Sequence, residues 1–200
     1  GLASTEYPNE KIIQLVKYFN ENGFSTGEFR RSAARGLQKI AEHDASLPRE
    51  IIELLTCWYF EESHPELSDC CDDNETPKDS ILWGFGGSYS LPGGRDIFFE
   101  AIAAGTLLES PPDYQEFNSF IAKIINFEKH PKIWAIGFRL MGFLFNWDKQ
   151  KTSDYFDHII NDIPHIFDSD IAIVYISRIL RFIPDKKTVQ VWIEKLGKKE

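Results

Sequence analysis

Basic residues are scarce in this chain, where 22 Lys and Arg stand against 31 Asp and Glu and the net charge at pH 7 is −9. A nucleic-acid groove needs clustered Lys and Arg to neutralise phosphates, and an anionic membrane surface attracts proteins through the same residues. No apolar run reaches the ~20 residues that cross a bilayer, and no signal peptide is recognisable. The sequence therefore predicts neither nucleic acid nor membrane as a partner.

Sulfur-containing residues are also few. The three cysteines are an odd number and form no disulfide framework, which favours a reducing compartment and a cytoplasmic location; they are Cys57, Cys70 and Cys71. The only methionine is Met141, and the chain opens with Gly1. We expect it to be a fragment of a longer protein.

Strand-like alternation is nearly absent, whereas apolar residues recur at helical spacing along most of the chain. A capping box at 25–28, which has the form Ser-Thr-Gly-Glu, precedes the second helix. About nine helices are predicted, followed by a short tail at 197–200; their ranges are 9–21, 29–43, 48–62, 95–108, 113–127, 132–146, 153–162, 169–182 and 184–196.

A faint repeat relates three of these helices. Residues 30–37 (RxxAAxGL) match residues 95–102 (RxxFFxAI), and residues 134–141 (WxxGFxLM) match both without the arginine. The last two segments are 134 − 95 = 39 residues apart, close to the roughly 40 residues of two-helix repeats. The first two are 95 − 30 = 65 residues apart, which is 26 residues more than this spacing of 39. One irregular insertion at 63–92 is about long enough to account for the difference. The pattern predicts one all-α domain over 1–200, a solenoid of stacked helix pairs.

Stacked pairs share a core and approach closely where side chains are small. The small residues at these helices are Ala33, Ala34, Gly36, Ala101, Ala103, Ala104, Gly105, Gly137 and Gly142. Large aromatic residues on the same helices are predicted to lie in the core, namely Phe98, Phe99, Phe138, Phe143, Phe145 and Trp147.

Helix 29–43 resembles the second helix of HEAT repeats, which often has the form Val-Arg-x-x-Ala-Ala-x-Ala-Leu. More narrowly, residues 45–182 resemble the C-terminal helical region of bacterial STAND or NACHT-type NTPases, several of which are implicated in antiphage defence. The segments on which this resemblance depends are LLTCWY at 54–59, HPE at 64–66, GGRD at 93–96 and EAIAA at 100–104. The resemblance implies a sensor or scaffold that contacts other domains of a longer chain, with the NTPase N-terminal to it.

A glycine-rich loop, including Gly93 and Gly94, leads into a predicted helix at Arg95, where exposed N–H groups can hold an anion. Neither a P-loop nor a dinucleotide fingerprint is complete, because Gly-Lys-Ser/Thr and a preceding strand are both missing. Arg95 is a candidate for binding a ligand carboxylate. The alternative, which we favour, is that it pairs with an acidic side chain or with carbonyl groups of an adjacent helix.

Metal ligands and nucleophiles are poorly represented. The acidic stretch 61–75 contains His64, Cys70 and Cys71, but adjacent cysteines seldom chelate one zinc ion and the stretch lacks the spacing of a calcium loop. Cys57, in the middle of a helix, is predicted to be a buried apolar residue without thiolate character. No metal site, cofactor or catalytic residue is predicted.

Three aromatic residues lie in the insertion, where no helix face requires their burial: Trp83, Phe85 and Tyr89. Amphipathic rings on loops are typical of recognition surfaces, so these residues and Arg95 are the candidate binding residues. Alternatively, the rings fold back over the groove between helices.

The resulting prediction is a non-catalytic module that binds a protein partner, through its repeat surface and the 83–95 loop. Two alternatives stay open. One is an all-α enzyme that acts on a phosphorylated substrate through the glycine-rich loop and Arg95, and the other is a structural spacer or oligomerisation segment.

Overall fold

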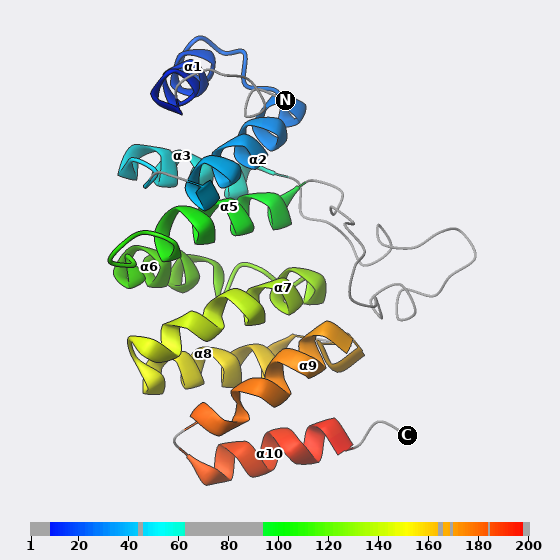
Figure 1. The fold of residues 1–200 in the computed structure, drawn as a ribbon. Helices are drawn as coiled ribbons and strands as arrows, with labels where there is room; N and C mark the ends of the chain where they lie inside the picture. Colours follow the sequence, from blue (N-terminus) through cyan, green and yellow to red (C-terminus); the bar gives the residue numbers. More distant parts are fainter. Residues whose placement is uncertain are drawn as a thin grey trace, which may run out of the picture. The chain divides into compact units, whose positions relative to one another are not determined.

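The structure is a computed structural model that describes residues 9–43, 46–62, 94–163, 166–168, 170–183 and 185–197 (Figure 1). Every regular element in these ranges is a helix, nine of them α-helices, so the all-α prediction is confirmed for the described part of the chain. None of these helices is long and apolar enough to cross a membrane. The chain divides into two compact units, with a boundary between Phe120 and Ile121. The prediction of a single repeat domain stays a prediction.

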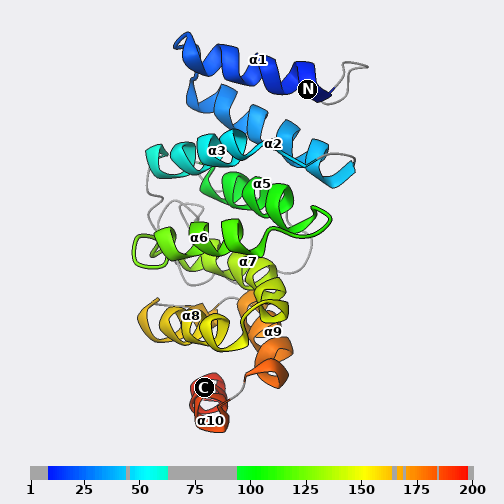
Figure 2. The same cartoon turned by 90° about the vertical axis from the view of Figure 1, so that its left-hand side faces the viewer.

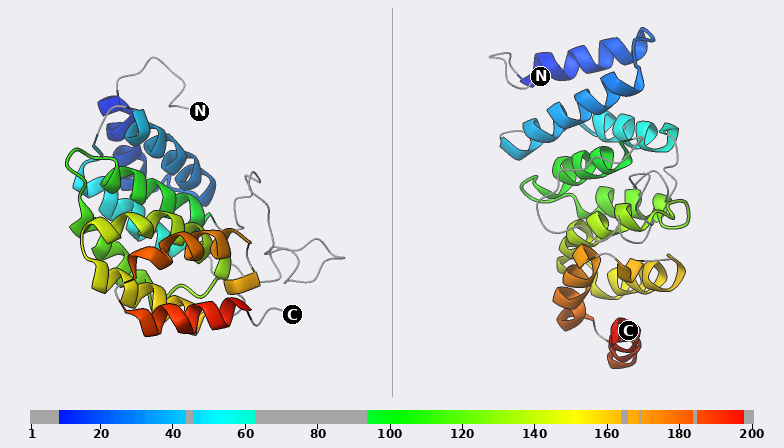
Figure 3. Two further views of the ribbon diagram at one scale, coloured as in Figure 1. Left: turned by 60° about the horizontal axis from the view of Figure 1, so that its bottom comes forward. Right: turned by 90° about the vertical axis from the view of Figure 1, so that its right-hand side faces the viewer.

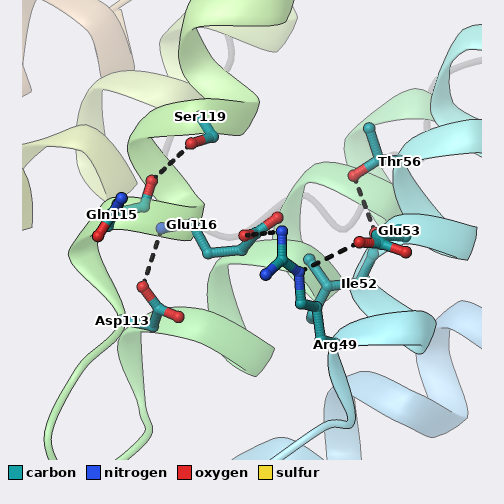
Figure 4. Close-up of polar contacts among 8 residues, drawn as sticks. All are labelled: Arg49, Ile52, Glu53, Thr56, Asp113, Gln115, Glu116 and Ser119. Carbon is teal, nitrogen blue, oxygen red and sulfur yellow. Dashed lines mark hydrogen bonds and ion pairs between the residues drawn. The ribbon is translucent and has the colours of Figure 1, made fainter.

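The first unit is built from helices that pack in two layers. α3 lies against α1 through an ion pair of Lys17 with Glu50, and it contacts α6 through Arg49 and Glu116, 3.9 Å apart (Figure 4). α5 packs along α2 and also against α3 (Figure 2). The helices are α1 (Asn9–Glu21), α2 (Gly27–His43), α3 (Arg49–Glu61), α5 (Arg95–Leu107) and the larger part of α6 (Tyr114–Ile124).

The second unit is also built from packed helices. α7 packs along α9. α8 lies beside α10, where the indole Nε1 of Trp192 donates to Asp157 Oδ1 at 2.8 Å and Lys195 bonds to Asn161 (Figure 3). The elements are α7 (Pro131–Met141), η3 (Gly142–Asn146), α8 (Lys149–Asp162), η4 (Ile166–Asp168), α9 (Asp170–Ile179), η5 (Leu180–Phe182) and α10 (Lys186–Gly197).

The starts of the helices follow from capping side chains. Thr26 Oγ1 accepts from the backbone N–H of Phe29 at 3.2 Å, so the capping residue of α2 is Thr26, one residue after the Ser25 of the predicted capping box. The helix begins at Gly27, two residues before the predicted start at 29. Ser25 Oγ instead accepts from Arg30 Nε at 2.9 Å. Asp113 Oδ1 caps α6 by accepting from the N–H of Glu116 at 2.9 Å (Figure 4).

Aromatic rings fill the core of each unit. In the first unit the Trp58 ring packs edge-on against both Phe29 and Phe98. In the second, Phe138 and Phe156 stack with ring centroids 4.8 Å apart. Such contacts add about 0.5–1.5 kcal/mol each to the free energy gained from burial.

Small residues permit a close approach of α5 to α3, in line with the predicted role of small residues between neighbouring helices. Gly105 lies where α5 meets α3, and a Cβ there would stand 2.6 Å from Ile52 Cδ1 and 2.8 Å from Leu47 Cδ1. Ala101 and Ala103 on the same helix are buried. By contrast, a Cβ on Gly142 would meet no atom within 4 Å, so this glycine does not permit a close approach.

The predicted core is right for four aromatic residues and wrong for two. Phe98, Phe99, Phe138 and Phe145 are buried, whereas Phe143 is 48% and Trp147 42% exposed. The prediction assumed one α-helix over 132–146, but the helix becomes a 3-10 turn at Gly142. Phe143 follows the buried Met141 by two residues, which is about 200° around a helix of 3.6 residues per turn, so it lies opposite the face that buries Met141, Leu144 and Phe145. Trp147 comes directly after the last residue of η3.

Candidate functional site

Arg95, the candidate binding residue that the structure describes, lies at the first turn of α5 and is 2% exposed. Its Nη2 donates to the backbone carbonyl of Glu62 at 2.9 Å, just beyond the end of α3. Its guanidinium lies over the Tyr59 ring, 5.6 Å from the centroid. These are contacts to an adjacent helix, as in the structural alternative given by the sequence, and they place the side chain inside the protein.

A second arginine approaches the same helix end from α2. Arg30, which aligns with Arg95 in the repeat, pairs its Nη1 with Glu61 Oε2 at 2.6 Å and lies over the Trp58 ring at 5.9 Å. The two aligned arginines therefore contact consecutive aromatic and acidic positions of α3. Cations at a helix C-terminus are stabilised by the partial negative charge of the last carbonyl groups.

The neighbouring Arg31 completes this group, here called the arginine clamp (Arg30, Arg31 and Arg95). Its Nη1 lies 3.6 Å from Glu62 Oε2. Gly94 has φ of 74°, and a Cβ there would stand 2.4 Å from Arg31 Cδ. Arg31 therefore packs against Glu62 and Gly94, which flank residues 63–93 in the sequence. The clamp holds both ends of the predicted insertion beside one another.

Glu62 is the least solvated acid of this group, since its side chain is 9% exposed. Loss of solvation raises the pKa of Glu62, and this effect outweighs the lowering of its pKa by Arg31, Arg30 and Arg95. The folded protein therefore holds a proton on Glu62 more readily than an unfolded chain does.

Another buried acid bonds to the backbone of a turn in the second unit. Glu128 is fully buried, and its Oε1 accepts from the backbone N–H groups of Lys129 at 3.0 Å and His130 at 2.9 Å. Its own carbonyl accepts from the indole Nε1 of Trp134 at 3.1 Å. These bonds order the turn before α7, so the observed role of Glu128 is structural.

Cys57 does not lie where the sequence predicts it. It is exposed, and its Sγ donates to Glu61 Oε1 at 3.3 Å. The prediction of a buried residue was wrong because the buried face of α3 passes through Leu55, Thr56, Trp58 and Tyr59 and leaves position 57 outside. Partial desolvation, followed by the Glu61 bond and charge, raises the pKa of the Cys57 thiol, which disfavours a nucleophilic thiolate.

The remaining candidate residues lie outside the described part of the chain. These are the binding candidates Trp83, Phe85 and Tyr89, together with Cys70, Cys71 and the acidic residues after Glu62. Within the described ranges, no group of three or more His, Cys, Asp and Glu side chains is arranged to hold a metal ion.

The sequence reasoning missed a group of exposed rings in the second unit. Phe143 and Trp147 are on its surface, and so is Phe182, which is 37% exposed. The sequence analysis assigned the first two to the core as large aromatic residues of the predicted helices, but Phe143 follows Met141 by only two residues and so lies on the opposite side of the helix. That spacing was the signal that could have identified Phe143 as exposed.

No family model, curated protein sequence or solved structure matches this chain.

Proposed function

We propose that this chain is a HEAT-like helical repeat module that binds a protein partner and does not itself catalyse a reaction. The main support is the repeated packing inside each unit. α5 packs along α2 in the first unit, and α9 packs along α7 in the second. The repeat alignment treats α2, α5 and α7 as the second members of successive pairs, and α9 lies outside the aligned segments.

The spacing of the contacts supports the same proposal. Asp157 and Trp192 are 35 residues apart, and Asn161 and Lys195 are 34 apart, so α8 and α10 run parallel. Phe145 stacks on Phe182, 182 − 145 = 37 residues later. Contacts that recur after 34 to 37 residues agree with a two-helix repeat of roughly 40 residues. Such arrays present extended surfaces that proteins use for binding partners.

The environment of Arg95 favours binding over the enzymatic alternative. A phosphorylated substrate would have to displace the carbonyl of Glu62 and the Tyr59 ring to reach the guanidinium. The arginine thus acts in the proposal as part of the clamp that supports the 83–95 loop. The narrower proposal, a sensor or scaffold of a STAND-type NTPase, rests on the sequence resemblance alone.

The test is a binding experiment with matched variants. The whole chain is immobilised and exposed to an extract of the source cells, and retained proteins are identified by mass spectrometry. The proposal predicts a protein that is retained by the parent chain and by Tyr18→Ala, which removes an exposed ring elsewhere, but is lost from Trp83→Ala/Tyr89→Ala. Turnover of a phosphorylated substrate that disappears in Arg95→Ala would favour the enzyme instead.

A further inference from the structure

Exposed rings gather at one edge of the second unit. α7 and α9 end in the 3-10 turns η3 and η5, which stack through Phe145 and Phe182 with centroids 5.7 Å apart. Phe143, Trp147 and Phe182 are 48%, 42% and 37% exposed. In Figure 1 the ends of α7 and α9 and the starts of α8 and α10 lie on the same side. We call this surface the aromatic edge; it comprises Phe143, Trp147, Phe182 and the first turns of α8 and α10.

Cations accompany these rings. Lys151 Nζ lies 5.6 Å from the Trp147 ring centroid, and Arg181 Cζ lies 4.7 Å from that of Phe182. The parallel contacts between α8 and α10 have offsets of 35 and 34 residues, which bring the first turns of the two helices level with each other. The edge therefore combines five exposed cations, namely Lys149, Lys151, Arg181, Lys186 and Lys187.

These lysines occupy positions that do not favour helix stability. The N-terminus of a helix has partial positive charge, so a lysine in the first turn is repelled. The helices α1, α2, α3, α5 and α6 each have an acidic residue in the first turn. α7, α8 and α10 have none, and of these α8 and α10 begin with lysines. A local conflict of this kind is expected where a surface serves binding.

The two carboxylates at this edge are occupied as helix caps. Asp148 Oδ1 accepts from the N–H of Lys151 at 3.0 Å. Asp185 accepts from the N–H groups of Lys187 and Thr188 at 3.2 and 3.0 Å, bonds that lower the pKa of Asp185. The edge as a whole keeps an excess of positive charge, with five cations against two carboxylates.

The net charge of the chain is also unevenly distributed between its two parts, with the positive excess in the part that contains the aromatic edge. Residues 1–120 contain 9 basic and 21 acidic residues, a net charge of −12, and residues 121–200 contain 13 and 10, a net charge of +3; together they give −9. A long nucleic acid would meet the repulsion of this total charge. A short acidic peptide needs only the local excess of cations.

We propose that the aromatic edge docks an acidic peptide segment of a partner protein, with a large apolar side chain of the peptide packed on the exposed rings. This deepens the proposed interaction function and rests on it. The rings supply apolar contact area, and the lysines and Arg181 pair with the carboxylates of the peptide.

The test is a selection of random 16-residue peptides, displayed on phage, against the folded full chain. Enriched peptides are expected to be acidic and to contain Trp, Phe or Leu. The synthetic form of the most enriched peptide should bind at least tenfold more weakly to Trp147→Ala and to Lys151→Glu/Arg181→Glu. Phe24→Ala, which removes a 60% exposed ring from the first unit, should bind as the parent does. Circular dichroism and cooperative unfolding verify that each variant is folded.

When the same peptide selection uses the Lys151→Glu/Arg181→Glu variant as its target, it should enrich basic peptides instead. The proposal is overturned by enriched peptides without acidic excess, or by tighter binding of a single-stranded dT16 oligonucleotide than of the peptide. Binding that is insensitive to the edge variants but lost in Trp83→Ala/Tyr89→Ala also overturns it, and leaves the proposed interaction function intact. If no peptide is enriched, the result contradicts both the docking of an acidic peptide at the aromatic edge and the proposed interaction function.

Discussion

At the scale of single residues, Arg95 is a structural cation within the first unit. Its guanidinium is buried, bonds to the Glu62 carbonyl and covers Tyr59. Arg95→Ala removes the charge and leaves that carbonyl without this donor, so we expect a loss of about 2–4 kcal/mol in the free energy of unfolding. Guanidinium denaturation measures the change. Arg35→Ala, at an exposed site on α2, is the control and should change it by less than about 0.5 kcal/mol. If Arg95→Ala also lowered the free energy of unfolding by less than about 0.5 kcal/mol, this would contradict a stabilising role of Arg95 in the arginine clamp.

Glu62 belongs to the same scale and gives a pH-dependent result. Its pKa is raised in the fold, so its contribution to stability is present below the unfolded pKa and is lost as the pH rises through the folded pKa. Glu62→Gln is neutral at every pH. We therefore expect this variant to be more stable than the parent at pH 7, by less than about 1 kcal/mol, and the difference to narrow toward pH 4. Urea denaturation at the two pH values tests this, and a variant less stable than the parent at pH 7 would show that the Arg31 ion pair dominates.

At the scale of helices, the α3–α5 contact depends on the missing side chain at Gly105. Gly105→Ala places a methyl group against Ile52 and Leu47, and overpacking of this kind typically costs about 1–3 kcal/mol. Gly142→Ala is the matched control, because a Cβ there meets open space. Thermal unfolding of both variants should give a Tm below that of the parent for Gly105→Ala only. Equal Tm values for the two variants would mean that α3 and α5 can move apart at little cost in free energy.

The helices also show which helix boundaries and helix types could be predicted from the apolar periodicity of the sequence. The range of α1 was predicted without error, and α3 and α5 within one residue at each end, because apolar spacing and local breakers agree there. The 3-10 turns η3 and η5 were not predicted, because the apolar residues from 142 to 146 suit either helix type. The exposure of Trp147, which comes directly after η3, was missed as well.

The arginine clamp was predictable only in part. The repeat alignment paired Arg30 with Arg95, and the structural alternative for Arg95 specified an acidic side chain or carbonyl groups of an adjacent helix. Which helix end both would contact depends on tertiary packing of α2 and α5 around α3. The shared target at Glu61 and Glu62 therefore could not be derived from spacing along the chain.

At the scale of the whole molecule, the account depends on α3 and α5 being one helix pair interrupted by an insertion. Arg95 reaches the Glu62 carbonyl at 2.9 Å, and Arg31 contacts both Glu62 and Gly94. The ends of the insertion are thus close enough for a short linker, and closing a shorter loop costs less entropy.

The most direct measurement is the thermal unfolding of a chain in which residues 64–92 are replaced by a linker of about six Gly and Ser residues. We predict that the helical circular dichroism of the remaining chain is retained and that unfolding stays cooperative, with a Tm equal to or above that of the parent. Loss of helicity or of the cooperative transition would contradict the paired-helix account.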